Sequence, residues 1–414
     1  MAAEPKANTS GRFRVGVNYW PARTAMGWWS DFDHDEVATD FARIAASGLD
    51  SVRLFLTWEA FQPAPDEVDR KMLDRLVTVA DIAGRTGLAI IPTLFTGHMS
   101  GVNWIPTWAL GGSDGDERFR VVTGGRVTKT GLRNWYADPD IGAAQELLAA
   151  EAAAALAGHE ALWVWDLGNE NSNCVIPPSQ ASARNWLDQI TSAIRMADPT
   201  ARITIGLHME DLEEDRKLGP QEASEACDLL SMHGYPIYAS WAESTTDEHL
   251  LPFLAHVTRW LGHGRDLLFS EFGLPTYRHG DPAGNKARRE SPSPLIEEHT
   301  AAAYTERALI SLREAGCAGA ILWCYTDYDP TIWETPPFDQ AIHERSFGLW
   351  RADGSPKPSV SVVAALTGTD RTDSPHDDTW IDIEPNEFVL EPGKHLRSLY
   401  RRYRNSGDTT SRDR

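Results

Sequence analysis

Short, almost entirely apolar runs alternate along this chain with longer segments in which apolar residues recur every three or four positions. The short runs have the length and the aromatic and β-branched content of buried strands, and the longer segments have the period of amphipathic helices. Eight such runs cover residues 12–20, 50–58, 88–95, 161–168, 202–207, 228–235, 266–273 and 319–325. Near-continuous apolar strands that alternate with helices are typical of a parallel sheet covered on both faces. Eight strand-helix units predict a (β/α)₈ TIM barrel.

Helices are predicted between these strands over residues 33–48, 66–87, 141–158, 182–198, 249–262, 300–316 and 357–368. Two long excursions, 96–140 and 326–349, interrupt the repeat, and each follows a predicted strand. In a barrel, segments that follow strands lie on the face where active sites are built. Loops of this length are usually functional or disordered, and their tryptophan and proline content favours order.

The pattern divides the chain into a barrel over 12–368 and a C-terminal extension over 369–404. The extension begins with a linker-like segment and then predicts a short strand and a helix, with Leu396, Leu399, Tyr400 and Tyr403 on one helix face. It is too small to hold a core of its own, so we expect it to dock on the barrel. Residues 405–414 are predicted to be a disordered tail.

Charge narrows the possible partners. The 39 basic and 60 acidic residues give a formal net charge of −21, which repels both nucleic acid and anionic membranes. No apolar run reaches the length of a transmembrane helix, and the first residues lack the features of a secretory signal, so a cytoplasmic location is expected. The four cysteines have no metal-ligand spacing, and neither a metal nor a cofactor is predicted. The oligomeric state is left open.

Polar side chains gather where the predicted strands end. The fourth strand runs into Gly168-Asn169-Glu170, and the seventh ends at Glu271. The other candidates are Arg53 and Trp58 on the second strand, His98 beyond the third, His233 and Tyr235 on the sixth, and Trp323 on the eighth. In a barrel these side chains converge on one pocket, with the two glutamates facing each other across it.

Two carboxylates that flank a bond are the groups needed for hydrolysis of a glycoside. One must hold a proton for the leaving oxygen, and the other must stay ionised to attack or stabilise a cationic centre. An apolar strand before Glu170 favours the first role, and Arg53 beside Glu271 would favour the second.

Several short motifs also resemble glycoside hydrolase family 5, in the large clan of barrel glycosidases. They are "VRLFLTW" (52–58), "GNE" (168–170), "HGY" (233–235), "SEFG" (270–273) and "ILW" (321–323), and the resemblance spans 12–368. The segment "GVNYWPARTAMGWWSDFDHDEVATDFARIAASGLDSVRLFLTWEAFQP" (16–63) and the C-terminal "IEPNEF" and "LRSLYRRYR" resemble its branch of intracellular β-mannosidases.

The resemblance implies a retaining double displacement, with Glu170 as acid/base and Glu271 as nucleophile. It further implies that Asn169 holds the sugar 2-hydroxyl, that Arg53 and Tyr235 hydrogen-bond the nucleophile, that His233 lies beside the acid/base, and that Trp323 forms the sugar platform. His98, which lies several residues past its strand, is also expected to bind the substrate.

Three functions are compatible with these residues. The first is an exo-β-mannosidase that removes terminal β-1,4-linked mannose from short oligosaccharides. The second is an endo-β-1,4-mannanase or a cellulase-like β-glucanase with an open cleft. The third is a non-catalytic sugar-binding barrel, against which the intact pair Glu170 and Glu271 counts. The long tryptophan-bearing excursions favour the first over the second, because a polymer needs an open groove. Trp104, Trp108, Trp135 and Trp333 in these excursions are equally compatible with loop packing and with sugar stacking.

Overall fold

A computed structural model describes residues 11–112, 118–372 and 378–410. Its centre is a sheet of eight strands, all pairs parallel, in the order β11-β10-β3-β2-β1-β16-β13-β12. The strands are β1 (Arg14–Asn18), β2 (Ser51–Thr57), β3 (Ala89–Thr96), β10 (Trp165–Asn169), β11 (Ile203–Gly206), β12 (Leu230–His233), β13 (Leu267–Phe272) and β16 (Gly319–Leu322). Six of them lie within a predicted strand, and β3 and β10 each extend one residue beyond theirs.

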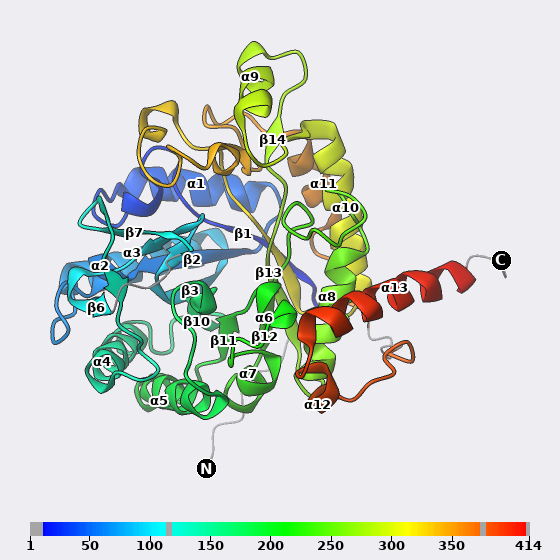
Figure 1. Ribbon diagram of the computed structural model, residues 1–414. Coiled ribbons are helices and arrows are strands. Elements are labelled where there is room, and N and C mark those ends of the chain that lie inside the picture. The colour runs from blue at the N-terminus through cyan, green and yellow to red at the C-terminus, as the bar shows by residue number, and fades with distance from the viewer. Residues whose placement is uncertain (1–10, 113–117, 373–377, 411–414) are drawn as a thin grey trace.

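The two ends of this sheet meet, so the sheet closes into a barrel. Beyond the end of β11, His208 forms a parallel bridge with His233, the last residue of β12. The backbone N–H of His233 donates to the carbonyl of Leu207 at 2.8 Å. The predicted (β/α)₈ TIM barrel is therefore confirmed (Figure 1).

The strands are buried because each has helices on one side and the barrel interior on the other. All seven residues of β2 are buried, as are all six of β13. This explains why the sequence shows continuous apolar runs rather than an alternating pattern.

A ring of helices surrounds the strands (Figure 1). Asp33, Asp69 and Asp138 each accept two backbone N–H groups at the start of a helix, which satisfies donors that have no partner within the helix. The larger helices of the ring are α1 (His34–Ala46), α3 (Arg70–Thr86), α4 (Pro139–Ala155), α5 (Gln180–Ala197), α7 (Pro220–Ala226), α8 (Leu250–Leu261), α10 (Glu298–Glu314) and α11 (Pro358–Leu366). Within the described ranges, no helix combines the length and apolar character needed to cross a bilayer.

The first excursion folds into small sheets that the hydrophobic pattern does not predict. One contains β4 (His98–Met99), β5 (Val102–Trp104), β7 (Arg120–Thr123) and β8 (Arg126–Thr128), and another pairs β6 (Leu110–Gly112) with β9 (Gly131–Leu132). The second excursion contains only the 3-10 helices η4 (Pro330–Ile332) and η5 (Ile342–Ser346).

The remaining elements are short segments in the connections between barrel units. They are η1 (Ala25–Gly27), α2 (Trp58–Phe61), η2 (Thr107–Ala109), η3 (Asn171–Asn173), α6 (Glu210–Glu213), β14 (Thr276–Tyr277), α9 (Pro282–Glu290) and β15 (Ile296–Glu297).

The C-terminal extension packs on the barrel through aromatic contacts. Tyr400 lies with its ring centroid 4.9 Å from that of Phe253 on α8, and Trp380 is buried beside them. The extension holds two helices, α12 (Pro385–Phe388) and α13 (Pro392–Thr410). The short strand predicted there is wrong: Ile381 and Ile383 alternate as in a strand, but the closed barrel leaves no edge for one to join.

The predicted disordered tail also needs correction. Helix α13 covers the first six residues of the 405–414 segment, and residues 411–414 lie outside the described part of the chain. Gly407 is a residue type that often ends helices, yet α13 continues through it to Thr410.

Candidate active site

The carboxyl ends of the barrel strands carry irregularities that direct polar side chains inward. The pairing of β10 with β11 shifts register between Asp166 and Asn169, and that of β12 with β13 shifts between Met232 and His233. Such bulges redirect side chains and are common beside active sites.

Glu170 follows β10 with φ 49° and ψ 48°, in the left-handed region. This conformation costs a residue other than glycine about 1–2 kcal/mol. Gly168, two residues earlier, has φ 151°, and a Cβ there would lie 2.2 Å from Asn171 Oδ1. A local backbone this constrained, at the end of a buried strand, marks Glu170 as a functional candidate.

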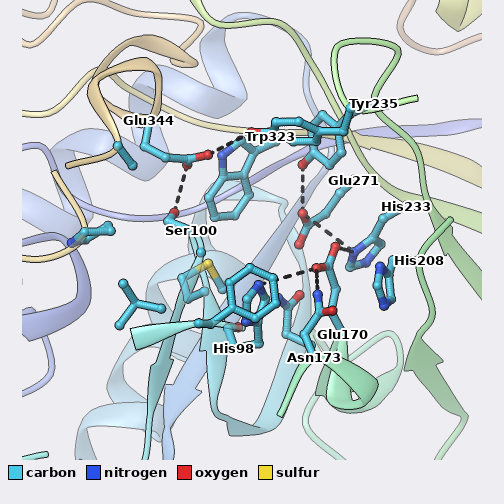
Figure 2. Close-up of a pocket in the computed structure, with 18 of the residues that line it drawn as sticks. His98, Ser100, Glu170, Asn173, His208, His233, Tyr235, Glu271, Trp323 and Glu344 are labelled. Atoms are coloured by element: carbon cyan, nitrogen blue, oxygen red, sulfur yellow. Dashed lines mark hydrogen bonds and ion pairs between the residues drawn. The ribbon is translucent and has the colours of Figure 1, made fainter. Parts of the chain in front are cut away.

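Glu170 and Glu271 meet in the pocket beside His233 (Figure 2). His233 Nδ1 lies 2.9 Å from Glu170 Oε1 and 3.7 Å from Glu271 Oε2. One ligating atom from each of the three residues lies within 4.8 Å of the others. Asn173 Nδ2 donates to the other oxygen of Glu170 at 2.9 Å. The two carboxylates predicted to face each other are thus brought together.

Arg53 is fully buried behind Glu271 and holds the base of the site together. Its NH1 donates to Glu271 Oε1 at 2.5 Å, and its NH2 donates to Asn169 Oδ1 at 2.8 Å. The remaining N–H groups face Asn18 Oδ1 at 3.1 Å and Asp166 Oδ2 at 2.7–2.8 Å. A rigid guanidinium with five donors suits this arrangement, because each donor finds an oxygen without a change of shape.

Tyr235 provides the second hydrogen bond to Glu271. Its hydroxyl donates to Oε2 at 2.8 Å. Burial, and then the charges of Glu271 and Glu170, raise the pKa of Tyr235 well above its ordinary value, so the hydroxyl keeps its proton. The predicted contacts of Arg53 and Tyr235 with Glu271 are both present.

The pKa values of the two carboxylates shift in opposite directions. Burial raises the pKa of Glu271 above its ordinary value, although His233 and Arg53 oppose the change. Burial also acts to raise the pKa of Glu170, but the interaction with His208 and the hydrogen bond from His233 outweigh it, and the pKa of Glu170 is lowered.

These pKa directions are the reverse of the sequence expectation, in which Glu170 holds the proton and Glu271 stays ionised, because imidazoles gather around Glu170 while burial dominates at Glu271. Because the carboxylates lie so close, this proton belongs to the pair rather than to one residue. His233 Nδ1 hydrogen-bonds Glu170 at 2.9 Å, whereas its 3.7 Å distance from Glu271 is too long for a hydrogen bond. A pair with separated pKa values can supply one acid and one anion at the same pH.

The other predicted side chains complete the pocket floor. Asn169 Nδ2 donates one hydrogen to the backbone oxygen of His98 at 3.0 Å, which leaves its second hydrogen for a ligand. Trp323 lines the pocket with its indole edge-to-face against Phe55, at 5.9 Å between centroids. It is positioned to present a flat apolar surface to a bound ring.

His98 lies on β4 and also lines the pocket. Burial lowers its pKa, so the ring is neutral at pH 7. Its Nδ1 is 2.7 Å from Asn103 Oδ1, which fits the tautomer with the hydrogen on Nδ1. Nε2, 3.8 Å from Glu170 Oε2, is then free to accept a hydrogen bond.

The pocket has a volume of about 730 Å³, in the range of sites for small ligands. Seven of the eight predicted site residues line it, and Arg53 lies beneath them. Sequence reasoning missed several polar lining residues on the excursions and connecting loops: Ser100, Arg118, Arg120, Asn173, His208, Glu210, Tyr238, His343 and Glu344. The position of the excursions after strands was the available signal, but it does not select individual side chains.

The four tryptophans left open by the sequence are packing residues. None of them lines the pocket. The indole N–H groups of Trp104, Trp108 and Trp333 donate to the backbone oxygens of Met99, Gln62 and Tyr328, and Trp135 is buried against Trp58.

Glu170, His233 and Glu271 carry atom types that also bind divalent metals. Around a zinc ion the ligating atoms would lie about 3.4 Å apart, given bonds of about 2.1 Å. Here Glu170 is hydrogen-bonded to His233 at 2.9 Å, and a guanidinium already binds Glu271. The arrangement therefore suits proton transfer better than metal binding.

Comparison with known proteins gives a consistent result. The family model Cellulase (glycosyl hydrolase family 5) matches residues 12–304. No curated protein matches the sequence. Among solved structures, exo-beta-1,4-mannosidase Op5Man5 from Opitutaceae bacterium strain TAV5 is 27% identical with a TM-score of 0.69, and the match covers 87% of this chain and 61% of that longer chain. GH5_18 from Streptomyces cattleya, in complex with GlcNAc, is 22% identical with a TM-score of 0.76, covering 95% and 90% of the two chains.

The matched region covers well over half of the chain. It contains seven of the eight barrel strands and both glutamates. The chain therefore belongs to glycosyl hydrolase family 5 and is a glycoside hydrolase.

Proposed function

We propose that this protein is a retaining exo-β-mannosidase that releases terminal β-1,4-linked mannose from short oligosaccharides. The observation that carries exo action is the closure of the pocket by the two excursions. Arg120 pairs through both guanidinium nitrogens with Asp339, at 2.7 and 2.8 Å, and thereby joins the first excursion to the second. Ser100 and Glu344 form another link between them, at 2.9 Å.

A third link closes the wall near Glu170. Arg118 of the first excursion pairs with Glu210 on α6. A long polymer would need a groove that continues past the reacting sugar, whereas these contacts join loops around the pocket. A site enclosed in this way favours the end of a chain.

The geometry supports a double displacement. In the first step Glu170 transfers its proton to the glycosidic oxygen while a Glu271 oxygen attacks the anomeric carbon, which breaks the bond to the leaving sugar and forms a glycosyl ester. In the second step Glu170 takes a proton from water, the water oxygen attacks the same carbon, and the Glu271 carboxylate is released. Two inversions give net retention.

The separation of the carboxylates supports retention over inversion. Retaining enzymes place the two carboxyl groups about 5–5.5 Å apart, whereas inverting enzymes need about 6.5–9.5 Å to fit a water between them. An oxygen of Glu170 and one of Glu271 lie within 4.8 Å of each other, which leaves little room for the water that inversion needs.

The choice of mannose is supported by the relative named as an exo-beta-1,4-mannosidase and by the β-mannosidase-like motifs of the sequence. A Streptomyces cattleya GH5_18 variant in complex with Manb1-4GlcNAc shows that the same fold accommodates such a disaccharide. An endo-mannanase or a β-glucanase is the alternative. A non-catalytic sugar-binding barrel fits poorly, because binding a sugar does not require two carboxylates side by side in the pocket. The cytoplasmic location stays a prediction.

Early products from mannohexaose test this proposal. Mannose and mannopentaose alone at low conversion would support an exo-mannosidase. Mannobiose and mannotriose at the earliest times would show an open cleft and endo action, and cleavage of cellohexaose instead would show a β-glucanase.

A further inference from the structure

Glu344 is a buried carboxylate in the pocket that the proposed reaction does not use. It lies on η5 in the second excursion and is 6% exposed. Figure 2 shows it entering from the side opposite Glu170, with the indole of Trp323 between them. Both glutamates line the same cavity.

The carboxylate is held by hydroxyl groups rather than by a cation. Ser100 Oγ donates to Oε2 at 2.9 Å and Tyr238 donates to Oε1 at 3.3 Å. His343 Nε2 lies 2.9 Å from the Tyr238 hydroxyl and 3.4 Å from Oε1. Among the residues that the structure describes, no lysine or arginine lies within 4.0 Å of this carboxylate.

This buried carboxylate can accept more hydrogen bonds than its neighbours donate to it. Its two oxygens offer about four acceptor positions, and the two hydroxyls take two of them. Burial of an anion is unfavourable unless hydrogen-bond donors surround it. The missing donors would come from a ligand in the cavity, and a sugar carries hydroxyl groups that can donate.

The position of Glu344 indicates which hydroxyls these are. The glycosidic oxygen must lie at Glu170, so the anomeric carbon of the bound sugar lies near the two catalytic carboxylates. Carbons 1 and 4 are at opposite ends of a pyranose ring. A ring resting on Trp323 therefore directs its C4 hydroxyl away from Glu170 and toward Glu344.

We infer that Glu344 accepts a hydrogen bond from the free C4 hydroxyl of the terminal sugar and is the residue that restricts the enzyme to chain ends. This inference rests on the proposed function and deepens it. In an internal β-1,4-linked sugar the C4 oxygen carries another sugar, so it has no hydrogen to donate. The additional sugar would also meet the buried carboxylate and the loops that Ser100 and Tyr238 tie to it.

The test compares p-nitrophenyl β-mannoside with its 4-deoxy analogue in the wild type, Glu344→Ala and Glu344→Gln. In the wild type, loss of a hydrogen bond to a charged group should lower kcat/KM for the 4-deoxy substrate about 10- to 100-fold. Glu344→Ala should lower kcat/KM for the parent substrate by a similar factor and reduce the 4-deoxy penalty to about twofold or less. Glu344→Gln, which keeps the shape but not the charge, should give an intermediate penalty.

Glu334→Gln is the matched control, because Glu334 is an exposed glutamate of the same excursion outside the pocket. It should keep both the activity and the 4-deoxy penalty of the wild type. A wild-type enzyme without a 4-deoxy penalty would overturn the inference, as would Glu344 variants that lose activity but keep the full penalty. If Glu344→Ala does not fold, Glu344→Gln decides by the same criterion.

The experiment also distinguishes failure of the proposed function from failure of the role proposed for Glu344. A wild-type enzyme that hydrolyses aryl β-glucoside but not β-mannoside would refute the choice of mannose. Comparing the aryl β-glucoside with its 4-deoxy analogue would then test the role of Glu344.

Discussion

Replacing Tyr235 with phenylalanine removes one hydrogen bond from Glu271 and leaves the ring in place. The lost contact is the 2.8 Å hydrogen bond from the Tyr235 hydroxyl to Oε2. Arg53 still binds Oε1, while the nearest other group at Oε2 is His233 Nδ1 at 3.7 Å. The variant therefore isolates a single interaction of the proposed nucleophile.

The expected effect depends on pH. The Tyr235 hydrogen bond lowers the pKa of Glu271, against the dominant effect of burial, which raises it. Without the hydroxyl the pKa of Glu271 rises further, so Glu271 needs a higher pH to ionise. The acid limb of kcat/KM should therefore move to higher pH.

The expected decrease in kcat/KM of the Tyr235→Phe variant follows from the strength of the lost hydrogen bond. A hydrogen bond to a charged group contributes about 1.5–3 kcal/mol, which corresponds to about 10- to 150-fold in rate. This full factor should appear on the acid side of the profile, where ionisation of Glu271 limits activity, and the deficit should shrink toward the plateau.

The assay is a pH profile of kcat/KM with an aryl β-mannoside, with circular dichroism to confirm folding. Tyr304→Phe is the control, because this buried tyrosine lies on α10 and its hydroxyl has no hydrogen-bond partner among the described residues. It should reproduce the wild-type profile. An unshifted acid limb in Tyr235→Phe would refute the reasoning.

Three further outcomes are expected. Glu271→Ala should lower kcat by more than tenfold, and azide should restore some activity with inverted product stereochemistry; retention of more than about a tenth of wild-type kcat would rule out Glu271 as nucleophile. Glu170→Ala should slow substrates with poor leaving groups about 10²–10⁴-fold and activated aryl glycosides far less, whereas equal losses on both would contradict its role as general acid. Dialysis against EDTA should leave kcat/KM unchanged, and a loss that a divalent ion reverses would contradict a metal-free reaction.

The centre of the site could be predicted from the sequence because barrel topology fixes where strand ends meet. Arg53, Glu170 and Glu271 come from three strands that are far apart in the sequence, and closure of the barrel alone brings them together. Each sits directly in or after an apolar run, so its place in the fold follows from the run itself.

The walls of the pocket could not be predicted in this way. Glu344 and Tyr238 lie on loops whose course depends on contacts distant in the sequence, such as that between Arg120 and Asp339, which are 219 residues apart. Such contacts leave no local hydrophobic period. The strand predicted around Ile381 and Ile383 failed for a related reason, because a local alternation does not reveal whether a sheet edge is free.

Trapping the intermediate tests the central claim most directly. The enzyme would be incubated with a 2-deoxy-2-fluoro-β-mannosyl fluoride, in which fluorine slows both steps and the fluoride leaving group keeps the first one accessible, and then digested for mass spectrometry. A double displacement with Glu271 as nucleophile predicts one fluoromannosyl group per chain, attached to Glu271. An intact enzyme without label, or a label on Glu170 or another residue, would contradict the account.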